Sequence, residues 1–202
     1  MTFKIISVDT LMLYFEQVIS EETLDQIQEV YNALRGLKGM VDLTPSYCSI
    51  LVQFDIFTYD HEQLIDIIKE QTIKGDNQIK KQSKFITIPT NYNKNLDLLR
   101  VANHNSLSTE EVIALHTQIT YRVYAIGFMV GFAYLATLDP KIITPRHSTP
   151  RKKVPKGSVA LADRQTAIYP QASAGGWNII GETKFDDFHL FEIGDRVQFE
   201  RV

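Results

Sequence analysis

The sequence lacks several features that would assign it to a class of protein at once. It has 202 residues but a single cysteine, Cys48, which excludes an intrachain disulfide framework and a zinc site built from several cysteines. No apolar run approaches the roughly 18 residues of a membrane span. The formal net charge is only −3, so no chain-wide field attracts nucleic acid or anionic membrane. We expect a soluble, cytoplasmic protein with neither partner.

Common catalytic and targeting motifs are also missing. The sequence contains no G-x-x-x-x-G-K-[ST], G-x-G-x-x-G, H-E-x-x-H or G-x-S-x-G. Its five histidines do not show metal-ligand spacing, so no metal site is expected. The first residues include Asp9 and Glu16 within an apolar stretch and no cationic start, which is typical of strands rather than a signal peptide. A site for ATP or phosphate would be of a less common type.

The first eighty residues predict alternating strand pairs and helices. "FKIIS" and "LMLYFEQ" are short β-prone segments. Ser20 has the character of a helix N-cap, and the apolar positions from Leu24 to Leu34 recur at helical spacing. "MVDLTPS" and "YCSILVQFD" indicate a second strand pair with a break at Pro45, and a second helix follows from about Asp60. This ββαββα order predicts an α+β domain.

A polar segment, residues 74–84 ("KGDNQIKKQSK"), separates that pattern from the strand-like "FITIPTNY". Polar segments with few apolar residues are typical of domain boundaries. We therefore predict an α+β domain over residues 1–83 and a second domain over residues 84–202. The second part has one clear helical signal, "SLSTEEVIALHTQ", followed by short β-rich pieces separated by Gly, Pro or Asp, which is typical of a small barrel or sandwich.

One short segment concentrates positive charge. Residues 144–158, "TPRHSTPRKKVPKGS", hold three prolines, five Lys or Arg and one His in fifteen positions. A nucleic-acid arm normally needs a larger basic face or interleaved aromatic residues, and this segment has neither. The alternatives are a solvated linker and an ordered loop that holds an anionic ligand.

Two further segments combine glycine with aromatic residues. "GFMVGFAYL", residues 127–135, could be a structural turn or a loop whose amides and rings line a pocket for an anion. "QTAIYPQASAGGWNIIGET", residues 165–183, is explained well by a tight β connection before a core Trp177. The functional alternative places Gln165, Thr166 and Tyr169 along a barrel face as hydrogen-bonding groups for a small polar ligand. His116, which ends the capped helix, is either packed at the helix terminus or a catalytic or ligand-binding imidazole.

Several of these segments together resemble a known family. "LSTEEVIALHTQITYRVYAIGFMVGFAYLATLDP", the segment from Thr144 to Thr183, and "GDRVQF" are similar to the 5-oxoprolinase component PxpB and the kinase inhibitor KipI. The same module resembles allophanate hydrolase subunit 1 and the first carboxyltransferase subdomain of urea carboxylase. The resemblance implies a ferredoxin-like α+β domain followed by a cyclophilin-like β-barrel. It also implies partner subunits like PxpA and PxpC, with which the chain would open 5-oxo-L-proline to L-glutamate with ATP hydrolysis.

The resemblance carries site residues over position by position. The matched residues are His116, Thr117, Gly127, Phe128, Gly131, Phe132, Pro145, Arg146, Pro150, Arg151, Gln165, Thr166, Tyr169, Gly175, Gly176 and Trp177. There are departures from the family pattern. Val130 and Ala174 stand where proline is usual, and residues 92–98, "YNKNLDL", replace a glycine-rich segment ending in "GPDL". These changes touch the expected pocket loops.

Two functions from different classes fit these residues. In an enzyme subunit, Arg146 and Arg151 would bind substrate carboxylate or transferred phosphate, and His116 would be a general acid or base. The residues Gln165, Thr166 and Tyr169 would orient the substrate. ATP would be a co-substrate, with Mg²⁺ at a partner subunit, and no tightly bound cofactor is expected. In the KipI-like alternative, the barrel would bind a sensor histidine kinase and suppress its autophosphorylation, with Trp177 or Phe132 as contact anchors. A carboxyltransferase is the third possibility, but the chain has no biotinyl segment.

Overall fold

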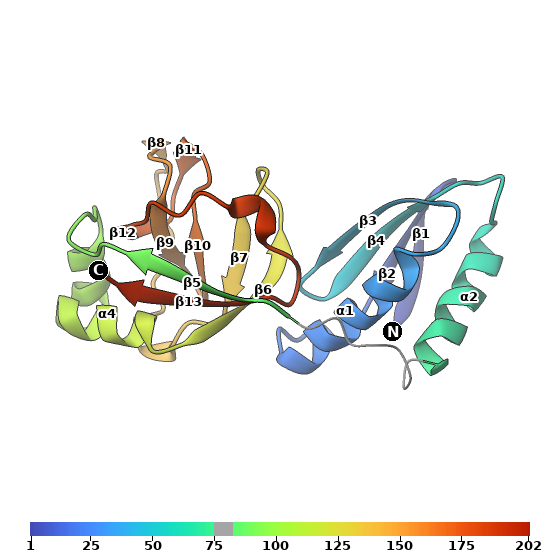
Figure 1. The fold of residues 1–202 in the computed structure, drawn as a ribbon, viewed down its shortest axis with the longest axis horizontal. Coiled ribbons are helices and arrows are strands. Elements are labelled where there is room, and N and C mark those ends of the chain that lie inside the picture. Colours follow the sequence, from blue (N-terminus) through green and yellow to red (C-terminus); the bar gives the residue numbers. More distant parts are fainter. Residues whose placement is uncertain (75–82) are drawn as a thin grey trace. The chain divides into compact units, whose positions relative to one another are not determined.

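A computed structural model describes residues 1–74 and 83–202 of the chain (Figure 1). The chain divides into two compact units, Met1–Gln82 and Ser83–Val202, which we call unit 1 and unit 2. The polar segment that we predicted as the boundary spans residues 74–84, and its residues 75–82 lie outside the described residues. No helix in the described part of the chain is long and apolar enough to cross a membrane.

Unit 1 is an antiparallel sheet with strand order β1-β2-β4-β3 and two helices. Its elements are β1 (Thr2–Ser7), β2 (Thr10–Tyr14), α1 (Glu21–Leu34), β3 (Met40–Ser46), β4 (Ser49–Phe54) and α2 (His61–Lys74). The predicted ββαββα order is therefore confirmed. A ferredoxin-like fold has the order βαββαβ, so the ferredoxin-like character expected for this unit is not confirmed.

The core of unit 1 follows from alternation in the strands and helical spacing in the helices. Leu11 and Leu13 of β2 and alternate residues of β4 pack against one face each of α1 and α2. Ser20 caps α1, since its hydroxyl accepts a hydrogen bond from the Thr23 amide at 3.1 Å. The predicted break at Pro45 is wrong, because β3 continues through it. This strand lies at the edge of the sheet, where a residue without an amide proton is tolerated.

Unit 2 is a nearly closed barrel-like sheet with helices and a small second sheet (Figure 1). Its elements are β5 (Phe85–Thr90), α3 (Leu98–His104), α4 (Thr109–Thr117), β6 (Thr120–Ile126), β7 (Ala133–Ala136), η2 (Pro140–Ile142), β8 (Arg151–Val154), β9 (Ser158–Ala162), β10 (Gln165–Ile168), β11 (Ser173–Gly175), β12 (Asn178–Glu182), η3 (Phe188–Leu190) and β13 (Arg196–Arg201). The main sheet has the order β12-β9-β10-β7-β6-β13-β5, and β8 pairs with β11. This architecture is consistent with the expected cyclophilin-like barrel.

The two ends of the main sheet are joined by a short seam. Asn91, just after β5, forms an antiparallel bridge with Glu182 at the end of β12, through hydrogen bonds of 2.8 and 3.1 Å. The Thr183 hydroxyl adds a 2.6 Å hydrogen bond to the Pro89 carbonyl. These bonds satisfy edge groups that an open sheet would leave unpaired.

The helices of unit 2 show which sequence signals were sufficient. The capping box of Ser108 and Glu111 is present, as predicted, at the start of α4. The helix α3 was missed, because it has only seven residues and no side-chain cap. It is held instead by burial of Leu98, Val101 and Ala102.

Gly157 provides a test of this barrel. Its φ is +79°, and a Cβ at this position would lie 2.3 Å from the Thr183 carbonyl oxygen. We expect Gly157→Ala to lower the free energy of unfolding of unit 2 by at least about 2 kcal/mol, because both the backbone strain and the clash must be relieved. Trp177, the one tryptophan in the sequence, lies in unit 2 and reports its unfolding by fluorescence during denaturant titration.

The matched control is Gly127→Ala, where a Cβ would meet no atom within 4 Å. Its unfolding midpoint should stay close to that of the unmodified chain. Equal midpoints for the two alanine variants would contradict the proposed constraint at Gly157.

Candidate functional site

A buried carboxylate organises the predicted basic loop. Asp97 is 4% exposed and immediately precedes α3. Its side chain accepts hydrogen bonds from Arg151 Nη2 at 2.6 Å, from His147 Nε2 at 3.1 Å and from the Ile179 amide at 2.7 Å. A buried charge is tolerated only with such partners. Asp97 therefore connects the start of α3, the basic segment and β12.

Further hydrogen bonds order the first half of the basic segment. The His147 amide donates to the Gly176 carbonyl at 2.7 Å. The Pro145 carbonyl accepts from Asn178 Nδ2 at 3.1 Å and from the Arg100 guanidinium. The segment is therefore ordered at residues 144–151 and then continues as β8, so the expected ordered loop extends only to the start of that strand.

Arg151 is oriented by one of its terminal nitrogens and leaves the other without a partner. Nη2 is bound to Asp97, whereas Nη1 is buried and has no hydrogen-bond partner within residues 1–74 and 83–202. An unsatisfied buried donor costs about 1 to 3 kcal/mol, and more if it is charged. A water or ligand oxygen at Nη1 would remove that cost, so Arg151 is a pre-oriented donor.

Arg146 lies near the same group of residues but is exposed. Its guanidinium carbon is 5.6 Å from the ring centroid of Trp177, and its Nε is 3.6 Å from an oxygen of Asp163. Burial raises the pKa of Tyr169, while a hydrogen bond to the Trp177 backbone and the charges of Arg146 and Arg151 lower it. The pKa of Tyr134 is likewise raised by burial and lowered by Arg146. Both guanidinium groups are thus close enough to influence these phenols.

Aromatic rings form one wall of this region. The Phe132 ring centroid lies 4.9 Å from that of Tyr134, 5.4 Å from Tyr169 and 5.8 Å from Trp177, each edge to face. Phe128, mostly exposed, is 5.4 Å from Phe132. Such packing fixes the rings in place. We call Arg146, Arg151, Tyr134, Tyr169 and Trp177 the cationic corner.

Two glycines in the matched motifs are required by close approach. A Cβ on Gly175 would lie 2.2 Å from the Tyr169 hydroxyl oxygen, and one on Gly131, whose φ is +80°, would lie 2.7 Å from Phe188 Cβ. Gly127 and Gly176 have more room. Val130 and Ala174, the two departures from the family pattern, are exposed, so neither disturbs the packing.

His116 lies elsewhere, in a fully buried hydrogen-bond chain. The Tyr92 hydroxyl is 2.7 Å from Nδ1, and the Thr166 hydroxyl oxygen is 2.8 Å from Nε2. Thr166 donates its proton to the Ala160 carbonyl at 2.9 Å, so it accepts from Nε2–H and Tyr92 donates to Nδ1. Burial lowers the pKa of His116 from 6.5 to about 3. The imidazole is therefore neutral and has both nitrogens occupied.

Strand alternation separates these groups. Gln165 and Ala167 of β10 face the same side as Tyr169, in the cluster with Trp177, whereas Thr166 points to the opposite side and His116. The structure thus brings together Arg146, Arg151, Gln165, Tyr169, Phe132, Gly175, Gly176 and Trp177 on one side of β10. It does not bring His116 or Thr166 to that side. The Thr117 hydroxyl donates to carbonyls of its own helix.

Asp97 was missed by the sequence reasoning. The available signal was its place in "YNKNLDL", the segment matched to the family's "GPDL". A lone acid one position before a short helix gave no sign of its partners, which lie 50 or more residues away.

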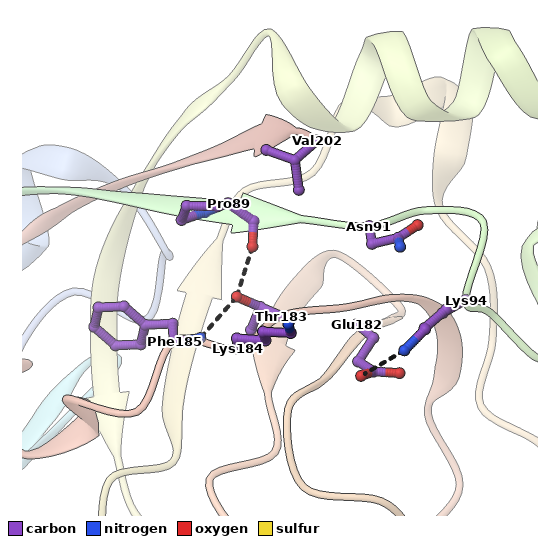
Figure 2. A pocket seen from close by; sticks show the side chains of 8 residues that line it. All are labelled: Pro89, Asn91, Lys94, Glu182, Thr183, Lys184, Phe185 and Val202. Carbon is purple, nitrogen blue, oxygen red and sulfur yellow. Dashed lines mark hydrogen bonds and ion pairs between the residues drawn. The ribbon is translucent and has the colours of Figure 1, made fainter.

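A separate pocket lies at the barrel seam (Figure 2). It has a volume of about 520 Å³, and Figure 2 shows Phe185 at one end and Lys94 at the other. Lys94 and Glu182 form a 3.5 Å ion pair between half-exposed side chains. It shares no residue with the cationic corner. Within the described residues, no group of three or more His, Cys, Asp or Glu side chains is placed to hold a metal ion.

Comparison with known proteins identifies relatives of the whole chain. The sequence matches the family described as carboxyltransferase domain, subdomain C and D, over residues 1–193. It is 31% identical to the 5-oxoprolinase subunit designated B of Bacillus subtilis (strain 168), over 95% of this chain and 89% of that protein. This agrees with the resemblance drawn from the sequence motifs.

Solved structures support the fold. A crystal structure of TTHA0988 has a TM-score of 0.84 and 33% identity, covering 97% of this chain but 40% of that chain. The urea carboxylase of Kluyveromyces lactis has a TM-score of 0.72 and 17% identity, covering 96% of this chain and 21% of that chain. The chain therefore spans well under half of both polypeptides.

The buried His116 predicts a pH dependence of stability. The unfolded chain binds a proton at this residue below about pH 6.5, but the folded chain does not until about pH 3. Stability is therefore lost as pH falls through this window. Between pH 7.5 and pH 5.0, His116 should account for about 2 kcal/mol of that loss, measured by Trp177 fluorescence in urea.

His116→Gln should lower stability at pH 7.5 but flatten its dependence on pH. The control is His104→Gln at an exposed position, which should leave the pH dependence unchanged. An unchanged pH dependence in His116→Gln would show that the imidazole is not held neutral.

The network around Asp97 predicts a second stability difference. Asp97→Asn should lower the free energy of unfolding of unit 2 by about 2 kcal/mol or more, because Arg151 would keep a largely buried charge without its counterion. Asp163→Asn removes an exposed partner of Arg146 and should cost no more than about 0.5 kcal/mol. Similar values for both variants would contradict the assigned role of Asp97.

Proposed function

Since the chain belongs to the family of carboxyltransferase subdomains C and D, and its curated relatives include subunits of 5-oxoprolinase, we propose that it is a subunit of an ATP-dependent 5-oxoprolinase. The assembly would open 5-oxo-L-proline to L-glutamate and hydrolyse ATP. Subunits similar to PxpA and PxpC would be its partners. The geometric observation that carries the proposal is the pre-oriented Arg151, with Nη1 unpartnered beside Arg146 and two phenols.

The proposed substrate suits the cationic corner. 5-Oxoproline carries a carboxylate next to a small lactam ring, and guanidinium groups bind carboxylates through charge-assisted hydrogen bonds. Arg151 Nη1 would donate to one carboxylate oxygen, and the exposed Arg146 would close over the ligand from the side of Trp177. Because Asp97 already fixes Arg151, little side-chain entropy is lost when the ligand binds.

The remaining polar groups divide by the face of β10 on which they lie. Gln165 is half-buried on the side of Tyr169, so it is the candidate to orient the lactam amide. Thr166 uses its hydroxyl within the protein, and His116 has no exposed surface. In this proposal both are structural residues, and neither transfers a proton to substrate.

ATP couples the hydrolysis of a stable amide. Transfer of the terminal phosphoryl group to the lactam oxygen would give ADP and an activated imidate. Water would then add to the imidate carbon, and loss of phosphate and cleavage of the C–N bond would yield glutamate. We place ATP, with Mg²⁺, as co-substrate of the assembly, with its metal on a partner subunit. The phosphoryl charge could also be met by Arg146.

The alternative is a regulator of a sensor histidine kinase. Phe132 and Trp177 are buried and unable to serve as contact anchors, but Phe128 and Val130 of the same loop are exposed. An autophosphorylation assay with a candidate kinase decides between the two, since a regulator must both bind and inhibit. Absence of inhibition would exclude this alternative.

The enzyme proposal predicts the effects of substitutions in the corner. With PxpA-like and PxpC-like subunits present, Arg146→Ala should raise the KM for 5-oxoproline at least tenfold, because an exposed carboxylate contact is lost. Arg151→Lys should lower kcat/KM by a similar factor, since lysine lacks the fork that bonds Asp97 and the ligand together. Glutamate release with ATP is the measurement.

Lys152→Ala is the matched control, because this side chain is exposed on the same segment. It should leave kcat and KM within about twofold of the unmodified chain. Unchanged kinetics in both arginine variants would remove the corner from the proposal, and absence of ATP-dependent turnover in the complete assembly would refute the activity itself.

A further inference from the structure

Unit 1 presents an apolar tip that neither its own core nor the proposed activity explains. Four large apolar side chains are strongly exposed there: Phe57 at 94%, Val8 at 71%, Val41 at 62% and Ile56 at 46%. Single exposed apolar residues are common on protein surfaces, but a contiguous group usually marks an interaction site. We call these four residues the apolar tip.

Backbone hydrogen bonds bring the four residues to one end of the sheet. The Phe54 amide donates to the Asp9 carbonyl at 2.9 Å, and the Asp55 amide donates to the Gly39 carbonyl at 2.8 Å. The turn between β1 and β2 and the start of β3 therefore flank the loop that leads from β4 to α2. Val8 and Val41 thus lie on either side of Ile56 and Phe57.

The tip is held by side-chain hydrogen bonds and is not a frayed loop. The carboxylate of Asp55 accepts from the Phe57 amide at 3.0 Å and from the Thr58 hydroxyl at 2.9 Å. His61 Nε2 is bonded to the Ser7 carbonyl at 2.9 Å. A surface ordered before binding loses less entropy when a partner docks.

Acidic side chains surround the tip. They are Asp9, Asp42, Asp55, Asp60 and Glu62, and Lys38 is the lysine nearest to them in sequence. Hydrogen bonds from Ser7, Gln53 and Thr10 lower the pKa of Asp9 to about 2, so it is ionised at neutral pH. A second copy docked by a two-fold axis would place this acidic rim against itself, which is unfavourable.

We propose that the apolar tip docks a different polypeptide, whose contact surface is apolar at its centre and carries Lys or Arg at its rim. The proposal rests on the proposed function in one respect, that the partner is another subunit of the same assembly. The long polypeptides among the solved relatives, in which this chain matches 40% or 21% of the length, support a partner that is joined covalently in those proteins.

The test compares two equally simple substitutions. Phe57→Ser removes the most exposed ring of the tip, and Val18→Ser removes an apolar side chain, 51% exposed, outside the tip. Neither side chain is buried, so both variants should fold. The probes are the purified PxpC-like and PxpA-like subunits, with affinity measured by interferometry at low and high salt.

We expect Phe57→Ser to weaken binding of one subunit at least tenfold and Val18→Ser to change it less than twofold. High salt should weaken binding further, since the rim contacts are ionic. Equal affinity for Phe57→Ser and the unmodified chain would overturn the proposal, as would failure of both subunits to bind. Sedimentation that showed self-association abolished by Phe57→Ser would overturn it in favour of a second copy.

Turnover is measured separately in the same mixtures. A complex that is sensitive to Phe57→Ser but releases no glutamate would refute the 5-oxoprolinase activity and leave the docking surface supported. Turnover without sensitivity to Phe57→Ser would do the reverse.

Discussion

The carboxylate of Asp97 is the constraint on which the arrangement of unit 2 depends. It is nearly inaccessible to water, so its charge must be met by donors from the protein. Those donors come from His147 and Arg151 in the basic segment and from the Ile179 amide of β12. The prolines restrict the loop, but this buried charge determines where the loop is attached. Removing the charge would release the loop, the strand and Arg151 together.

The alternation of side chains along β10 gives neighbouring residues unrelated roles. Thr166 faces His116 and completes a hydrogen-bond chain that ends at the Ala160 carbonyl. Gln165, one residue earlier, faces the cationic corner with Tyr169. A motif that is continuous in sequence therefore serves both the core and the site. Proximity in sequence to a binding residue is weak evidence for contact with a ligand.

Local signals made much of the fold predictable, and distant contacts did not. The cap at Ser20, the capping box at Ser108 and the strand alternation each depend on residues within a few positions, and each was confirmed. The helix α3 was missed because its stability comes from burial against the barrel rather than from its own sequence. The link between Asp97 and Arg151 spans 54 positions, and no periodicity in the sequence indicates it. Pro45 was misread because strand order, which places β3 at an edge, was unknown.

The geometry also constrains how the proposed reaction would be divided among subunits. Opening the lactam requires a proton at the departing nitrogen and an activated water. His116 is neutral and enclosed, and Asp97 is committed to its three donors. The cationic corner supplies guanidinium groups and phenols, which bind and orient anions better than they transfer protons near neutral pH. A chain of this composition suits recognition of the substrate carboxylate, so proton transfer and phosphoryl transfer belong to the surface that a partner would present to it.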